Sequence, residues 1–210
     1  MLTLLILLVL LNYLVETTIK VLNFKESKKP LHPTLANLYS ESEYQRSLEY
    51  SQANFTTSVA NSTYSVAILV VALLMGVFGA IDRWVREFTS SEILIAIIFF
   101  AIIFLASDLL DLPFDLYGTF VIEAKFGFNK TTSKTFIFDK IKGYLLGGVL
   151  GGGLLTLIIF IYQNSGGAFW ILGWLLLSLF SLVMFMFGTT LILPLFNKLK
   201  PLEDGELKDE

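Results

Sequence analysis

The chain has 210 residues, of which 55% are hydrophobic and 16% charged, and its net charge is −3. Soluble domains carry about 25% charged residues, and charges are costly in the hydrocarbon core of a bilayer, so this deficit indicates a membrane protein. The small net charge argues against a nucleic-acid-binding protein. Because the sequence has no cysteine, disulfides, thiolate metal sites and a cysteine nucleophile are excluded.

The first predicted element is a transmembrane helix over about residues 2–18, since a bilayer-spanning helix needs about 20 mostly apolar residues. No Lys or Arg precedes it, whereas a secretory signal peptide begins with basic residues, so we expect a retained helix. Two polar residues lie within it, Asn12 and Glu16. Glu16 falls near one end of the span, and Asn12 can hydrogen-bond to a neighbouring helix.

Residues 40–43 read Ser-Glu-Ser-Glu, a capping box in which the first serine begins a helix and the last glutamate reaches back to it. Tyr44, Leu48 and Phe55 follow at spacings of four and seven, which places them on one helix face. This pattern fits a cytoplasmic amphipathic helix on the membrane, or a plain N-terminal extension of the second span, which is the simpler interpretation. The second span is predicted over about residues 59–81.

The third span is predicted over about residues 93–110, with three carboxylates at and beyond its end. Asp108, Asp111 and Asp115 share one face at helical spacing. Intramembrane acids are often functional, so a cation or proton site is one interpretation. We favour an interfacial helix end, because Pro113 is expected to break the helix between these residues.

The last two spans share a stretch without charged residues between Lys142 and Lys198. This stretch is too long for one helix, and Asn-Ser-Gly-Gly at residues 164–167 divides it. We therefore predict a fourth span over about residues 143–162 and a fifth over about residues 168–193.

The fourth span is rich in glycine, at positions 143, 147, 148, 151, 152 and 153. Pairs of small residues four apart let helix backbones approach closely in lipid. We favour tight packing against a neighbouring span, and the alternative is a gap that lines a cavity.

Basic residues predict the orientation, because Lys and Arg concentrate in cytoplasmic loops. With five spans, thirteen of them fall on one side of the membrane and only Arg83 and Arg86 on the other. The N-terminus is therefore predicted outside, and the tail over residues 194–210 in the cytoplasm. This gives an all-α polytopic fold with a five-helix membrane domain over residues 1–193. A bacterial inner membrane and an endoplasmic reticulum membrane both remain open.

Three segments carry a family pattern. They are residues 112–143, with Leu-Pro-Phe-Asp-Leu-Tyr-Gly and Phe-Gly-Phe-Asn-Lys-Thr-Thr, residues 194–208, with Pro-Leu-Phe-Asn-Lys-Leu-Lys-Pro-Leu, and residues 39–50. Together they resemble the integral-membrane CAAX prenyl proteases, zinc metalloendopeptidases that remove the last three residues of prenylated proteins. The resemblance covers essentially the whole chain.

The resemblance implies a seven-helix enzyme that encloses a large intramembrane chamber. Its zinc site, His-Glu-x-x-His plus a further glutamate, comes later in the chain than this sequence reaches. Two histidines one turn apart bind zinc there, and the glutamate activates the bound water. This sequence has one histidine, His32, so no catalytic, cofactor or metal residue is carried over. We expect zinc only in the full-length enzyme and no activity from this chain alone.

The leading hypothesis is therefore the N-terminal membrane domain of such a protease, forming part of the chamber wall and the substrate entrance. The expected partners are the lipid bilayer, the C-terminal protease half and prenylated protein C-termini. The alternatives are a small transporter or channel subunit that uses the acids near the third span, and a non-catalytic membrane scaffold. A truncated chain, a gene fragment and a split partner would each end as this sequence does.

The segment over about residues 112–142 is dense in aromatic residues, and burying each large side chain contributes roughly 1.5–3 kcal/mol. We expect it to fold against the protease half, into which residues 194–208 would lead. The alternative is that it packs on the ends of its own helices. The candidate interdomain contacts are Glu123, Phe126, Asn129, Pro194 and Asn197.

Overall fold

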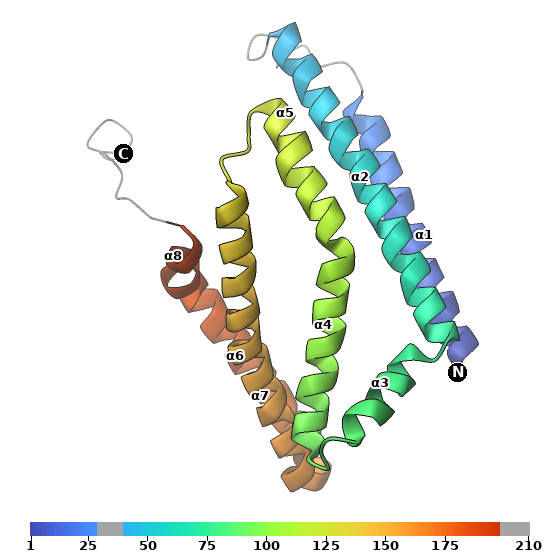
Figure 1. Ribbon diagram of the computed structural model, residues 1–210, viewed down its shortest axis with the longest axis vertical. Coiled ribbons are helices and arrows are strands. Elements are labelled where there is room, and N and C mark those ends of the chain that lie inside the picture. Colours follow the sequence, from blue (N-terminus) through green and yellow to red (C-terminus); the bar gives the residue numbers. More distant parts are fainter. Residues whose placement is uncertain (29–39, 198–210) are drawn as a thin grey trace. The chain divides into compact units, whose positions relative to one another are not determined.

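The computed structural model describes residues 1–28 and 40–197. These residues are almost entirely helical, with no β-strand among them (Figure 1), which confirms the all-α class. The helices form two compact units. The first contains Met1–Ser90 and Ile98–Thr131, and the second contains Ser91–Ile97 and Thr132–Glu210.

In the first unit, α1 (Leu2–Ser27) and α2 (Glu41–Leu74) run side by side as a helical hairpin (Figure 1). The contacts between them include Tyr13 Oη to Thr63 Oγ1 at 2.7 Å, Lys20 Nζ donating to Ser62 Oγ at 2.7 Å, and the stacked rings of Phe24 and Phe55 at 4.2 Å. At 26 residues, α1 is about 39 Å long and exceeds the roughly 30 Å of a hydrocarbon core. It therefore continues beyond the span predicted over residues 2–18.

The start of α2 confirms the capping box. Ser40 Oγ accepts a hydrogen bond from Glu43 N at 3.3 Å, and Ser40 N donates to Glu43 Oε2 at 2.9 Å. From this cap the helix runs without interruption to Leu74. The segment after the cap is therefore the N-terminal extension of the second span, and a separate amphipathic helix is not formed there.

The second span ends earlier than predicted. Instead of continuing to Ile81, α2 ends at Leu74, and Gly76 adopts a left-handed conformation with φ +66°. Glycine tolerates this conformation because it has no Cβ. A new helix, α3 (Val77–Arg86), begins directly afterwards. Hydropathy alone could not separate the two helices, because apolar residues continue across the glycine.

The helix of the third span continues past the end predicted at residue 110, because Pro113 does not break it. Helix α4 (Glu92–Tyr117) contains Pro113, and a π-helical segment, η2 (Gly118–Glu123), continues it into α5 (Ala124–Phe126). Proline removes one backbone donor, but its fixed φ is compatible with a helix. Tertiary contacts flank it on α2, where Ser65 Oγ donates to Asp111 Oδ1 at 3.2 Å and the ring of Tyr64 lies 5.4 Å from that of Phe114.

The second unit contains α6 (Ser133–Ser165), the 3-10 turn η3 (Gly166–Ala168), α7 (Phe169–Phe187), the π-helical η4 (Gly188–Ile192) and α8 (Leu193–Phe196). Gly166, with φ +51°, reverses the chain so that α7 packs back along α6 (Figure 1). Tyr162 and Phe169 close this turn with their rings 5.1 Å apart.

Four continuous stretches of the described chain are long and apolar enough to cross a membrane. The last of them, Ser133–Phe196, has 64 residues, and because about 20 residues suffice for one crossing, it is long enough for two, one by α6 and one by α7. Many large apolar side chains are exposed, and among the described residues only four large apolar side chains are buried: Val85, Ile122 and Phe126 in the first unit and Ile95 in the second. Such a surface suits a multi-pass membrane protein, whose outer face meets apolar lipid tails.

Close packing of the α6 glycines against a neighbouring span stays a prediction. A Cβ atom added at any of the positions 143, 147, 148, 151, 152 and 153 would meet nothing within 4 Å. Within the described residues of the second unit, no other helix approaches these glycines closely.

Candidate functional site

The predicted contact residues lie at two separate places. Glu123, Phe126 and Asn129 belong to the first unit, around the turn that follows α5. Pro194 and Asn197 belong to the second unit, at α8. We describe the two places in turn.

The turn after α5 is held by an aromatic cradle, which we define as Arg46, Tyr50, Phe126 and Phe128. The ring of Tyr50 meets those of Phe126 and Phe128 edge-on, with centroids 5.2 and 5.0 Å apart. Arg46 Nη2 donates a hydrogen bond of 2.6 Å to the carbonyl oxygen of Phe126. Phe126 is only 4% exposed, whereas Phe128 is 61% exposed. The N-terminal part of α2 therefore packs against the end of α5.

Gly127 makes the turn possible, because its φ of +80° lies in the left-handed region that glycine adopts most readily. A Cβ there would also come within 3.4 Å of Arg46 Nη2. The carbonyl oxygen of Glu123 accepts from the backbone N–H groups of Phe128 and Asn129, at 2.9 and 3.2 Å. Asn129 Oδ1 in turn accepts from Thr131 N at 2.6 Å. These local bonds satisfy the backbone groups that a helix end leaves without partners.

These contacts show how the first unit uses the predicted residues. The ring of Phe126 is covered by Tyr50, Glu123 contributes its backbone carbonyl, and the Asn129 side chain shapes the turn. Glu123 and Asn129 remain half-buried and Phe128 exposed, so an outer surface is left at this place. Contact of this surface with a protease half stays a prediction.

Arg46 and Tyr50 were not predicted from the sequence. The helix after the capping box was recognised by its apolar face, whereas these two residues lie on another face, four positions apart. Their partner, Phe126, is eighty positions from Arg46. Their spacing of four positions only weakly indicated a shared contact, because no nearby residue shows what a pair on an exposed helix face will touch.

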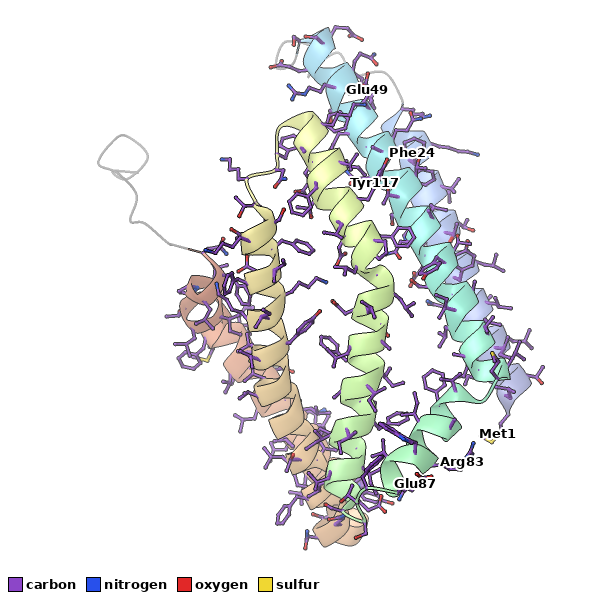
Figure 2. The ribbon with its side chains drawn as sticks, viewed as in Figure 1. Met1, Phe24, Glu49, Arg83, Glu87 and Tyr117 are labelled. Carbon is purple, nitrogen blue, oxygen red and sulfur yellow. The ribbon has the colours of Figure 1, made fainter. Side chains whose placement is uncertain are left out.

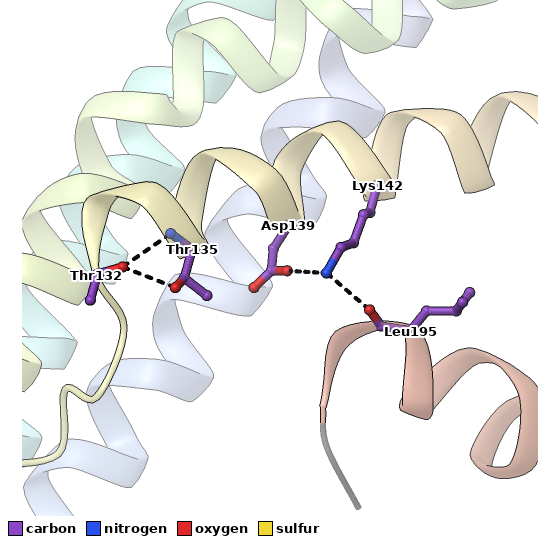
Figure 3. A network of polar contacts seen from close by, with 5 residues as sticks. All are labelled: Thr132, Thr135, Asp139, Lys142 and Leu195. Atoms are coloured by element: carbon purple, nitrogen blue, oxygen red, sulfur yellow. Dashed lines mark hydrogen bonds and ion pairs between the residues drawn. The ribbon is translucent and has the colours of Figure 1, made fainter.

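The second place is a C-terminal latch, which we define as Asp139, Lys142, Leu195 and Phe196; Figure 3 shows the first three. Lys142 Nζ, on α6, donates to the carbonyl oxygen of Leu195 at 3.0 Å and pairs with Asp139 Oδ1 at 3.2 Å. The same ammonium lies 5.8 Å from the centroid of the Phe196 ring. The latch therefore fixes the position of α8 against α6.

Thr132 begins α6 just before the latch, where its hydroxyl accepts from Thr135 N at 3.1 Å (Figure 3). Pro194 lies in the first turn of α8, where its missing N–H costs no hydrogen bond. Asn197 ends α8 in an extended conformation, and its N–H donates to Leu193 O at 3.0 Å. Pro194 and Asn197 are both exposed, so their side chains are accessible at the end of the unit.

The described residues do not fit a zinc site, because no three of their His, Cys, Asp or Glu side chains come together to hold a metal ion. The single histidine, His32, lies outside the described residues. The pKa of one acidic group, Glu43, is clearly shifted. The hydroxyl of Ser40, and then its backbone N–H, hydrogen-bond to Glu43 and hold the pKa of that carboxyl below its ordinary value.

Comparisons with known proteins agree on one family. The profile described as "CAAX prenyl protease N-terminal, five membrane helices" matches residues 20–198. The "CAAX prenyl protease 1 homolog" of Arabidopsis thaliana is 36% identical over 206 residues, covering 94% of this chain and 49% of that protein. The "CAAX prenyl protease 1" of Saccharomyces cerevisiae is 32% identical over 197 residues, covering 88% of this chain and 43% of that protein.

A solved structure extends the similarity to three dimensions. The crystal structure of S. mikatae Ste24p matches with a TM-score of 0.85 and 29% sequence identity, covering 96% of this chain and 49% of that one. The chain thus spans about half the length of the relatives that it matches.

Proposed function

This chain belongs to the CAAX prenyl protease family and corresponds to its N-terminal membrane domain, and from that premise we propose that it forms one wall of an intramembrane chamber and part of the substrate entrance. The observation that carries the proposal is the match of nearly the whole chain to the Ste24p fold. The glycines of α6 support it, because positions without side chains leave room beside a helix.

The proposed partner is the C-terminal protease half of the family. In this proposal that half supplies the zinc ligands and the general base, since the described residues here offer no metal site. This chain's own contribution is to enclose the reacting centre with apolar helices and to exclude bulk water from it. The exposed residues Phe128, Pro194 and Asn197 are proposed to meet the protease half.

We further propose that the N-terminus faces outside and the tail faces the cytoplasm. The concentration of thirteen of the fifteen basic residues on one side supports this orientation. The chain has no native cysteine, so Asn164→Cys and Lys200→Cys can be labelled singly with an impermeant thiol reagent. Asn164→Cys should label from outside and Lys200→Cys only after permeabilisation. Labelling of both from one side would refute the orientation.

A chimera tests the functional proposal. The N-terminal half of the S. cerevisiae relative is replaced by this chain, in cells lacking their own enzyme, and cleavage of a prenylated CAAX peptide is measured in membranes. We expect cleavage to return. A matched chimera, with residues 127–132 replaced by a Gly/Ser linker of equal length, should cleave less, because the cradle loses its turn.

Membrane insertion and thermal stability of both chimeras are measured alongside cleavage, so that misfolding is recognised. A chimera that inserts and unfolds cooperatively but cleaves nothing would refute the assignment to the chamber wall. The transporter alternative is less favoured, because the matching family is that of a protease and the acids near the third span do not come together as a metal-holding group in the described residues.

A further inference from the structure

Helix α3 (Val77–Arg86) is too short to cross a membrane. Its ten residues are about 15 Å long, against the roughly 30 Å of the hydrocarbon core. In the chain it lies between α2 and α4, both of which are long and apolar enough to span. The two spans hold α3 at the bilayer surface, at the end of α2 remote from the capping box.

The sequence of α3 is strongly amphipathic. At 100° per residue, its large apolar side chains and that of the following Phe88 fall within an arc of about 120°: Val77, Phe78, Ile81, Trp84, Val85 and Phe88. The charged side chains fall on the other side: Asp82, Arg83, Arg86 and Glu87. Arg83 and Glu87 lie along the same side of the helix (Figure 2).

Only part of the apolar arc is covered by protein. Val85 is completely buried, but Trp84 is 52% exposed and Phe88 is 67% exposed. The rings of Trp84 and Phe88 lie edge to face with centroids 5.0 Å apart, so they form one continuous aromatic patch. The exposed parts of the two rings therefore form one apolar surface.

The charges beside the patch suit a lipid headgroup layer. Arg86 Nε pairs with Asp82 Oδ2 at 3.1 Å, with both side chains more than 40% exposed. The two arginines and the two acids balance, which complements headgroups that carry both a phosphate and an ammonium group. Tryptophan is also enriched at membrane–water interfaces, where its amphipathic ring sits at the level of the headgroups.

We propose that α3 is an interfacial anchor, lying flat in the phospholipid headgroup layer. Trp84 and Phe88 enter the boundary of the acyl chains, and Arg83 and Arg86 bind lipid phosphate. The anchor fixes the depth of the α2–α4 connection in the bilayer. This inference goes beyond the proposed function, since it rests only on the membrane placement of α2 and α4.

Tryptophan fluorescence of the full chain in phosphatidylcholine vesicles tests the anchor. Trp170→Phe and Trp174→Phe together leave Trp84 as the single fluorophore, because the sequence has three tryptophans. Lipids brominated at shallow or at deep acyl positions serve as quenchers. We expect the shallow bromines to quench Trp84 more than the deep ones, and aqueous iodide to quench it less than free tryptophan.

Two variants in this background distinguish contact of the patch with lipid from a general effect of mutation on folding. Phe88→Ser removes half of the patch. It should raise quenching of Trp84 by aqueous acrylamide about twofold, because the Trp84 ring would then move toward water. Gly79→Ser, on the opposite face of α3, is the matched control: Gly79 is exposed and an added Cβ would meet only Arg83 Nη1 at 3.5 Å, so it should leave the quenching unchanged.

Three results would overturn the proposal. Iodide quenching as strong as for free tryptophan would place Trp84 in water. Insensitivity to both bromine and iodide would show that protein, such as a second copy of the chain, covers the patch. Stronger quenching by the deep bromines than by the shallow ones would place α3 inside the hydrocarbon core.

Discussion

The aromatic cradle should stabilise the end of α5 mainly through one side chain, Phe126. Truncating a buried phenylalanine to alanine costs about 3–5 kcal/mol, which includes roughly 0.5–1.5 kcal/mol for an edge-to-face aromatic pair. Phe126 is 4% exposed but lies near the end of the unit, where neighbours can relax. We therefore expect Phe126→Ala to cost about 3 kcal/mol, the low end of the range.

Phe128→Ala is the matched control, because Phe128 meets the same Tyr50 ring at nearly the same distance. Phe128 is 61% exposed, so its truncation removes little burial, and we expect a cost of about 1 kcal/mol, mostly the aromatic pair. The two variants differ in burial and not in chemistry.

Hydrogen exchange measured by mass spectrometry reports this local stability directly. In detergent micelles, Phe126→Ala should speed amide exchange over residues 118–132 by roughly 150-fold, and Phe128→Ala by roughly fivefold. Peptides from the first turns of α1 serve as the internal control and should not change. Equal acceleration by the two variants, or none by Phe126→Ala, would refute the reasoning that burial against α2 holds the turn.

Three further predictions concern single local interactions. Lys142→Met removes the bond to Leu195 O and should cost about 1 kcal/mol, seen as roughly fivefold faster exchange over α8; unchanged exchange would contradict the latch. Ser40→Ala should raise the pKa of Glu43 toward its ordinary value, measured by carboxyl NMR. In the unmutated chain, this bond stabilises the helix end at pH values above the pKa of glutamate in the unfolded chain. Its contribution is lost as the pH falls through the lowered pKa of the folded chain. If the pKa of Glu43 is the same in the variant, Ser40 is not the cause of its shift. Gly76→Ala should cost about 1–2 kcal/mol in thermal unfolding, because φ +66° disfavours a Cβ although nothing within 4 Å would touch it; an unchanged midpoint would disprove the left-handed turn.

Membrane segments were predictable because the bilayer acts on each segment separately. Every backbone group in the hydrocarbon core needs a partner within its own helix, so a sufficiently long apolar run specifies a helix without knowledge of its neighbours. The cap of α2 was predictable for a similar reason, since Ser40 and Glu43 satisfy each other within one turn. The turn at residues 164–167 likewise divided α6 from α7 as expected.

Helix continuations were harder to predict, because they depend on context. Pro113 disfavours a helix locally, yet α4 continues through it while Asp111 and Phe114 contact α2. Conversely, the apolar run through Gly76 looked continuous, but the backbone turns there. In both cases the local preference amounts to a few kcal/mol at most, which tertiary contacts can match.

The sequence by itself therefore determined the class of the protein, its family and the existence of its spans, because these follow from hydropathy and short motifs. Only the tertiary structure showed that Arg46 and Tyr50 hold Phe126, and that Lys142 holds the carbonyl of Leu195. The physical reason is distance along the chain. The Arg46–Phe126 and Lys142–Leu195 partners are 80 and 53 positions apart, and no local pattern specifies which exposed face of a helix will meet a residue so remote.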